Sequence, residues 1–275
     1  MLLHAASRGA GPPVALLHGL YGHAGNFATI QRRLAEGGHR VLALDLRNHG
    51  ASPHAAAMTY PDMAEDVLET LRDAGALPCA LIGHSMGGKV AMCAALAAPA
   101  AIARLLVADI APVAYHHAAE HGGYLAAMQA VRLHPGLTRA AADAALAAAV
   151  PDPRVRGFLL YNLVIGAAPH WRLDLPAIAA ALPELTGWPA AEDGPYPGPA
   201  LFLAGGRSDY VRPEYRPAIR ALFPRARFAT LKAAGHWLHA DDPEGFISVA
   251  AAFLAAPDPA GQGGETSRAL AAEQT

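Results

Sequence analysis

The sequence predicts an α/β fold, in which a mainly parallel central sheet is flanked by helices and interrupted by a helical insertion. Short runs rich in leucine and β-branched residues alternate with alanine-rich segments of helix length, which is typical of parallel strands joined by crossover helices. The alternation stops for about ninety residues in the middle of the chain and then resumes. A length of 275 residues favours one large domain over two small ones.

The apolar runs and the turn residues that separate them place the individual elements. Six strands are expected, at Val14–Leu17, Arg40–Leu44, Cys79–Ile82, Leu105–Ile110, Ala200–Ala204 and Arg227–Leu231. Five helices are expected between or after them, at Asn26–Glu36, Tyr60–Asp73, Met86–Ala98, Pro213–Leu222 and Gly245–Leu254. Because the insertion follows one strand and ends before the next, it is expected to cover one end of the sheet.

Proline and glycine mark the boundaries of these parts. We expect a first part of the core at residues 1–111, a helical cap at 112–198, a second part of the core at 199–256 and a disordered tail at 257–275. Six larger apolar residues of the cap are candidates for lining a substrate pocket, and we expect two or three to meet substrate: Tyr124, Met128, Phe158, Tyr161, Trp171 and Trp188.

Composition limits the location and the partners. The net charge is −2 and the charged residues are scattered, which argues against binding of nucleic acid. The chain has no apolar run long enough to cross a bilayer, and its first residues do not resemble a secretory signal, so a cytoplasmic location is expected. The two cysteines, Cys79 and Cys93, fall in a predicted strand and a predicted helix, which favours reduced thiols of the core.

A candidate nucleophile lies between a predicted strand and a predicted helix. The sequence GHSMGG at residues 83–88 places Ser85 in a sharp turn, where glycines on both sides leave room for a strained backbone. At the N-terminus of the helix, the serine hydroxyl can attack a carbonyl while the helix dipole favours the developing negative charge.

A tight turn follows the first predicted central strand, in the sequence HGLYG at residues 18–22. Such a turn can point the N–H of Leu20 toward Ser85, and the N–H of Met86 would be the second donor of an oxyanion hole. His18 in the same turn is interpreted as structural. Tyr21 and His84 are expected to contact substrate.

The general base is expected to be a histidine after the last strand, and His236 stands there in the sequence AAGHW. The following residue, Trp237, is expected to contact substrate and to screen the site from water. His239 is a weaker candidate for the base. The order nucleophile, acid, histidine along the chain is one of the known orders of serine hydrolases.

Two aspartates at strand ends are candidates for the acid that orients His236. Asp209 follows the strand predicted at Ala200–Ala204, and Asp109 lies at the end of the strand that follows the nucleophile. Either loop can bring a carboxylate to the histidine. Asp209 is preferred and Asp109 is the alternative. An aspartate that only caps a turn is the non-functional interpretation of each.

On these motifs the chain resembles the α/β-hydrolases and, within that fold, the serine esterases of the YbfF type and their mitochondrial relatives in animals. The matching stretches are Leu17–Leu20, Asp45–Pro53, Gly83–Lys89, Asp109–Pro112 and Ala234–Trp237. The Arg-Asn-His-Gly loop at residues 47–50 together with the serine motif points to this subgroup more specifically than the serine motif alone does. The subgroup carries the Asp-Ile-Ala-Pro segment and often has no aspartate at the position of Asp209, so the resemblance favours Asp109 and the acid stays open.

Two further motifs have weaker functional interpretations. His117, Glu120 and His121 match the H-x-x-E-H zinc pattern, but without a third ligand nearby a surface histidine cluster is preferred, and no metal site is expected. The loop at residues 45–50 either contacts substrate or, as we prefer, is held rigid by hydrogen bonds of its own side chains.

The sequence thus predicts a serine hydrolase of carboxylic esters with short to medium acyl groups. The mechanism requires no metal or organic cofactor. The same chemistry would serve acyl thioesters, including acyl-CoA, and lactones. A binding module without activity is the alternative of a different class. The expected partner is a small-molecule ester, with no integral membrane association, and the sequence leaves the oligomeric state undefined.

Overall fold

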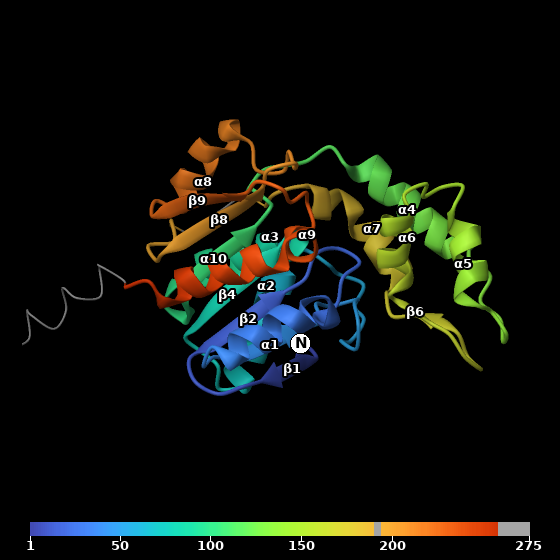
Figure 1. Cartoon of the computed structure of the whole chain (residues 1–275), viewed down its shortest axis with the longest axis horizontal. Coiled ribbons are helices and arrows are strands. Elements are labelled where there is room, and N and C mark those ends of the chain that lie inside the picture. The colour runs from blue at the N-terminus through green and yellow to red at the C-terminus, as the bar shows by residue number, and fades with distance from the viewer. Residues whose placement is uncertain (190–193, 258–275) are drawn as a thin grey trace, which may run out of the picture.

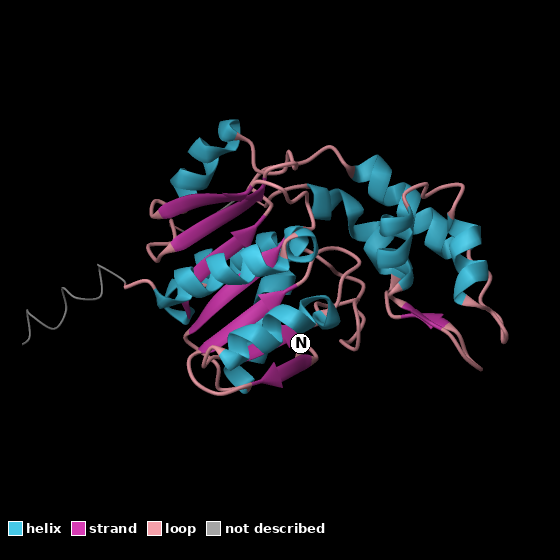
Figure 2. Cartoon of the chain, viewed as in Figure 1, coloured by secondary structure: helices cyan, strands magenta, loops and turns pink. Residues whose placement is uncertain are grey.

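A computed structural model describes residues 1–189 and 194–257 and places a seven-stranded sheet at the centre of the molecule (Figures 1 and 2). Its strand order is β1-β3-β2-β4-β5-β8-β9, and all neighbouring strands are parallel except the edge pair β1 and β3. The strands are β1 (Ala5–Arg8), β2 (Pro13–Leu17), β3 (Arg40–Leu44), β4 (Cys79–His84), β5 (Ile102–Ala108), β8 (Ala200–Gly205) and β9 (Ala226–Leu231).

Helices cover both faces of this sheet, as the near-continuous apolar strands require. Alternate residues of β2, β4 and β5 point to opposite faces, so that Leu17 packs in one core and Leu16 in the other. One face carries α1 (Ala28–Glu36) and α10 (Pro243–Ala255), and the other carries α2 (Tyr60–Asp73), α3 (Met86–Ala97) and α8 (Arg216–Leu222).

Each strand and helix expected from the apolar pattern is present, with ends that move by up to a few residues. The strand expected to reach Ile110 already ends at Ala108, because Asp109 turns the chain with a φ of 52°. Outside the insertion, the edge strand β1 and the short helix α9 (Leu238–Asp241) were not expected. The residues of β1, Ala-Ala-Ser-Arg, have no strand preference, and pairing with β3 holds them extended.

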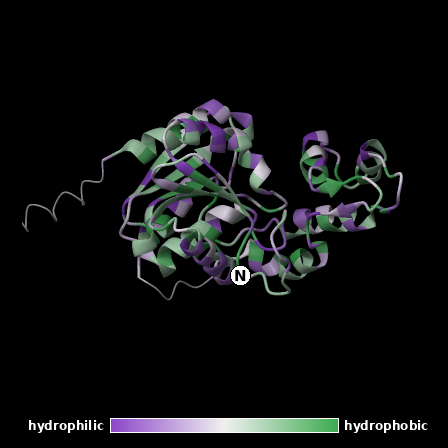
Figure 3. Cartoon of the chain, turned by 90° about the horizontal axis from the view of Figure 1, so that it is seen from below, coloured by the Kyte–Doolittle hydropathy of each residue, from purple (hydrophilic) through white to green (hydrophobic). Residues whose placement is uncertain are grey.

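The insertion between β5 and β8 forms a lobe beside one end of the sheet (Figures 1 and 3). It contains α4 (Ala118–Ala130), α5 (Arg139–Leu146), α6 (Pro153–Leu160) and α7 (Leu175–Thr186). It is not wholly helical, since β6 (Leu163–Val164) and β7 (His170–Trp171) form a small antiparallel hairpin. Three 3-10 turns occur elsewhere, at Ala24–Phe27, Pro99–Ala101 and Pro213–Tyr215.

The two cysteines are free thiols, with Cys79 buried in β4 and Cys93 half-buried in α3. Burial raises the pKa of each thiol to about 12. Within the described residues, no helix combines the length and the apolar character that a membrane crossing demands. Residues 258–275, which make up almost all of the predicted disordered tail, lie outside the described part of the chain.

Candidate active site

Ser85 sits between β4 and α3 in a backbone conformation that few residues other than glycine adopt, with φ 53° and ψ −121°. The turn closes only because its neighbours have no side chains. A Cβ on Gly83 would lie 2.2 Å from the carbonyl oxygen of Gly87, and a Cβ on Gly87 would lie 2.4 Å from that of His18. The strained turn lifts the serine hydroxyl clear of the sheet, as the sequence motif predicts.

Ser85 is the first member of a hydrogen-bonded chain of three side chains. The Nε2 atom of His236 lies 3.0 Å from the hydroxyl oxygen of Ser85, and its Nδ1 atom lies 2.8 Å from Oδ2 of Asp109. Asp109 is fully buried, whereas the His236 side chain is 25% exposed. An Nδ1–H that donates to the carboxylate leaves Nε2 free to accept the serine proton, which is the arrangement that nucleophilic catalysis by serine requires.

The structure corrects the preference for Asp209 as the acid. The Asp209 side chain is 62% exposed and accepts a hydrogen bond of 2.6 Å from Arg212. The side chain that turns inward from this loop is that of the preceding residue, Ser208. Its hydroxyl donates to Oδ2 of Asp109, the same oxygen that His236 contacts. The N–H of Gly205 donates to Oδ1 at 2.9 Å, so Asp109 accepts three hydrogen bonds.

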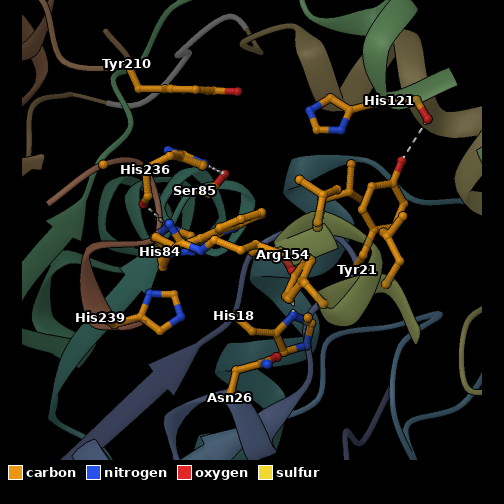
Figure 4. A pocket seen from close by; sticks show the side chains of 18 of the residues that line it. His18, Tyr21, Asn26, His84, Ser85, His121, Arg154, Tyr210, His236 and His239 are labelled. Carbon is orange, nitrogen blue, oxygen red and sulfur yellow. Dashed lines mark hydrogen bonds between the residues drawn. The ribbon is translucent and has the colours of Figure 1, made fainter. Parts of the chain in front are cut away.

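The sequence reasoning missed two residues of this loop. Besides Ser208, Tyr210 lies with its ring stacked on the imidazole of His236, at a centroid distance of 3.9 Å and an angle of 21° (Figure 4). Both residues flank Asp209 in the sequence, so the loop was identified correctly and the contacting residues within it were not. No feature of the sequence distinguishes which side chain of a loop turns inward.

His84, next to the serine, supports the loop that carries His236. Its Nε2 lies 2.8 Å from the backbone carbonyl of His236 and therefore donates to it. Burial, with smaller effects of His239 and His236, lowers the pKa of His84 well below its usual value, so the ring is neutral at pH 7. Burial lowers the pKa of His239 to about 4. His84 is thus a neutral side chain that holds the backbone of His236 in place.

The two residues expected to supply the N–H donors of an oxyanion hole line the same cavity as Ser85. Leu20 and Met86 both line the cavity beside Ser85, and neither N–H donates to an acceptor in the described part of the chain. The turn that presents Leu20 is fixed by His18, which is 1% exposed. His18 donates from Nδ1 to the carbonyl of Gly19 at 2.8 Å and accepts the Leu46 N–H at 2.9 Å, which agrees with its structural interpretation.

Two cavities share Ser85 in their linings. We call the larger, of 420 Å³, the wide chamber (Figure 4). It is bounded by the end of the sheet and by the insertion, and its lining includes the three residues expected to contact substrate: Tyr21, His84 and Trp237. We call the smaller, of 40 Å³, the narrow chamber. Ser85 lines both, so a bound ester can extend in two directions from the reacting carbonyl.

Of the six apolar residues proposed for the cap, Tyr124 and Phe158 line the wide chamber. Met128 is fully buried in the hydrophobic core and Tyr161 is 50% exposed, and neither they nor the two tryptophans, Trp171 and Trp188, line either chamber. Met128, Trp171 and Trp188 pack in or against the hydrophobic core instead.

The H-x-x-E-H segment does not form a surface cluster. His117 and His121 are half-buried and line both chambers, because the start of α4 lies over the serine. Among the residues that the structure describes, no group of His, Cys, Asp and Glu side chains is arranged to hold a metal ion.

The loop at residues 45–50 is held by its own side chains, as preferred above. Arg47 forms an ion pair of 2.6 Å with Asp66, and the Asn48 amide bonds to both the N–H and the carbonyl of Ala55. Neither side chain lines either chamber. His49 accepts the Tyr21 N–H at 3.3 Å, so the loop supports the turn that contains Leu20.

Comparison with known proteins gives a consistent picture. Residues 14–249 match the model of the alpha/beta hydrolase family. The sn-1-specific diacylglycerol lipase ABHD11 of Mus musculus is 42% identical over 250 residues, which cover 89% of this chain and 81% of that protein. Esterase YbfF of Escherichia coli is 37% identical over 242 residues, which cover 88% of this chain and 92% of that protein.

Among solved structures, a marine microorganism esterase superposes with a TM-score of 0.88 at 35% identity, covering 92% of this chain and 99% of that one. The similar proteins are named esterases or lipases, which supports a hydrolase of the carboxylic-ester type. The match over most of the chain, together with the sheet order and the serine turn, shows that the chain belongs to the alpha/beta hydrolase family.

Proposed function

We propose that this protein hydrolyses carboxylic esters with short to medium acyl groups by way of a Ser85–His236–Asp109 triad and an acyl-enzyme. The observation that carries the proposal is the continuous chain of hydrogen bonds from the Ser85 hydroxyl through both nitrogens of His236 to the buried carboxylate of Asp109. The names of the relatives support the same reaction class.

In the first half of the reaction, the Ser85 oxygen bonds to the ester carbonyl carbon and its proton passes to Nε2 of His236. The N–H groups of Leu20 and Met86 stabilise the oxyanion, and the loss of one such donor typically costs about 3 kcal/mol. The bond to the alcohol oxygen then breaks, and His236 returns the proton to that oxygen. In the second half, water attacks the acyl-enzyme with His236 again as the base, and the acid leaves.

The same proton transfer assigns the two chambers. Because His236 must protonate the leaving oxygen, the alcohol lies on the side of His236 and Trp237, in the wide chamber. The acyl group then extends past Met86 into the narrow chamber, which does not include His236. A large alcohol and a short acyl group fit these volumes.

The test is a burst experiment with p-nitrophenyl esters of increasing acyl length, on wild type and Ser85→Ala. We expect a stoichiometric burst, labelling of Ser85 by a fluorophosphonate and an optimum at short acyl groups. The variant should lose about 10⁴-fold or more in kcat. A folded wild type without burst or labelling contradicts the triad, and preferred hydrolysis of long-chain diacylglycerols contradicts the assignment of the chambers.

A cytoplasmic location and a small-molecule ester as the partner remain predictions from the sequence.

A further inference from the structure

The narrow chamber contains one of the two lysines of the chain. The sequence has only Lys89 and Lys232, and Lys89 is 1% exposed. It stands one helical turn beyond the serine, since its backbone N–H donates to the carbonyl of Ser85 at 3.1 Å. A lysine this deeply buried normally has a charged partner.

The partners of Lys89 are neutral. Its ammonium group donates to the carbonyl of Gly187 and lies 3.5 Å from that of Thr186, at the C-terminal end of α7. It also lies 5.4 Å and 4.9 Å from the ring centroids of Tyr60 and Tyr115. In the described part of the chain, no carboxylate comes within salt-bridge distance of Lys89.

The acidic groups of the site lie elsewhere. Glu120, Asp209 and Asp241 all line the wide chamber, together with Arg154. Among the residues described, the lining of the narrow chamber contains no aspartate, glutamate or arginine, and Lys89 is its one lysine. The two chambers therefore differ in charge as well as in volume.

Burial without a counter-charge is costly for an ammonium group. It lowers the pKa of Lys89 to about 7, which means that the neutral partners offset only part of the cost of burying the charge. A carboxylate placed in the narrow chamber would supply the missing negative charge by charge-assisted hydrogen bonds. It would reach the ammonium from the direction of the serine, since both Ser85 and Lys89 line this cavity.

We propose that the acyl groups this enzyme prefers are short and end in a carboxylate, so that its substrates are half-esters of dicarboxylic acids whose free carboxylate binds Lys89. This inference rests on the proposed function and on the placement of the acyl group in the narrow chamber. Lys89 is then a specificity-determining residue, and its partners on α7 fix the position of its ammonium group.

The kinetic test compares pairs of ethyl esters that differ only at the far end of the acyl chain. Monoethyl succinate, glutarate and adipate are each paired with the neutral ester in which an isopropyl group replaces the carboxylate, and hydrolysis is followed by pH-stat titration at pH 7. For the best-fitting length, we expect kcat/KM of wild type to favour the half-ester by about tenfold or more, as hydrogen bonds to charged groups would provide.

The variant Lys89→Met has a side chain of similar length and no charge. It should reverse the ratio within the pair, so that the neutral ester becomes the better substrate. The matched control is Lys232→Met, which changes an exposed lysine outside both chambers and should keep the wild-type ratio.

A second measurement does not depend on turnover or on the folding of the Lys89 variant. With [ε-¹³C]lysine, NMR of Ser85→Ala should show two signals, which Lys232→Met assigns. Added monoethyl glutarate should shift the Lys89 signal and leave that of Lys232 in place, while the neutral ester should shift neither in the direction of protonation.

The outcomes separate the two proposals. In one outcome, neutral esters give a burst, the half-ester has no higher kcat/KM than its neutral partner, and the Lys89 signal does not shift. The carboxylate preference is then wrong, and the proposed ester hydrolysis is unaffected. If no ester gives a burst or labels Ser85, the proposed function fails, and the inference that rests on it fails as well.

Discussion

At the scale of single residues, Asp109 shows how a backbone conformation brings a carboxylate to His236. The residue follows β5 with a φ of 52°, and its side chain turns back under the sheet end to accept hydrogen bonds from His236, Ser208 and Gly205. Asp209 has the same side chain at the end of a neighbouring strand, but its carboxylate faces solvent and Arg212. The surroundings of the carboxylate, and not its place after a strand, make the difference.

The first prediction concerns these two aspartates. Asp109→Asn should lower kcat by about 10⁴-fold, because an asparagine cannot hold His236 in the tautomer that accepts the serine proton. Asp209→Asn should stay within about threefold of wild type, since exposed ion pairs contribute little. Steady-state kinetics with one p-nitrophenyl ester measures both. Equal losses in the two variants would mean that neither carboxylate orients the histidine.

Ser208 is a positioning residue, because it contacts Asp109 and touches no reacting atom. Ser208→Ala should lower kcat by about tenfold with little change in KM, since the loss of a hydrogen bond to a buried charged group costs about 1.5–3 kcal/mol, partly recovered by relaxation. Ser208→Thr should restore most of the rate. A rise in KM at constant kcat would place Ser208 in substrate binding instead.

At the scale of elements, α3 links the nucleophile to the insertion. Ser85 is its N-cap, and one turn later Lys89 contacts the carbonyls at the C-terminal end of α7. The partial negative charge at that helix end favours a cation, which offsets part of the cost of burying one. The same residue can thus fix the insertion relative to the serine and, when protonated, offer a positive charge to the narrow chamber.

The stability of the protein should depend on pH through this lysine. Its pKa is about 7 in the folded protein and near 10.5 when unfolded, so between these values the unfolded chain binds more protons. The free energy of unfolding of wild type, relative to that of Lys89→Met, should therefore rise with pH from 7 to 9. The slope should approach about 1.4 kcal/mol per pH unit.

Urea titrations at pH 6, 7, 8 and 9 measure this difference. Below pH 7 the lysine is protonated in both the folded and the unfolded state. The difference in free energy of unfolding between wild type and Lys89→Met should therefore not change with pH there. A difference that is independent of pH up to 9 would mean that the ammonium group is not destabilised by burial.

At the scale of the whole molecule, the site exists only where the sheet and the insertion meet. The wide chamber is lined by the turn after β2, the loops after β8 and β9, and helices α4 and α6 (Figures 1 and 4). The narrow chamber adds Leu182 and Leu185 of α7 to Met86 and Ile110 of the core. The dimensions of both chambers are therefore set by how α4, α6 and α7 pack over the strand ends.

This division predicts opposite effects of two truncations. Leu185→Ala should move the optimum acyl length upward, because it enlarges the narrow chamber, at a stability cost of about 2–5 kcal/mol. Phe158→Ala should leave the acyl optimum in place and change the preference among alcohols, because Phe158 lines the wide chamber against Trp237. An acyl optimum that moves with Phe158 and not with Leu185 would reverse the chamber assignment.

Much of the fold could be predicted from the sequence because its signals are local. Apolar runs bounded by turns placed the strands of the sheet except β1, and the motif around Ser85 fixed the nucleophile turn, because only glycine fits at residues 83 and 87. The candidate base, His236, followed from its place after the last strand. The antiparallel edge strand and the hairpin of the insertion lacked such signals, because they are held by pairing rather than by preference.

The sequence by itself determined the α/β architecture and the serine turn, since each depends on residues that are close along the chain, and it indicated His236 by its place after the last strand. Only the tertiary structure showed that Asp109 and not Asp209 contacts His236, brought Ser208 to Asp109 and Tyr210 to His236, and placed Lys89 without a counter-charge beside the narrow chamber. The physical reason is that the direction of a loop side chain and the charges around a buried group depend on packing between segments that are far apart in sequence.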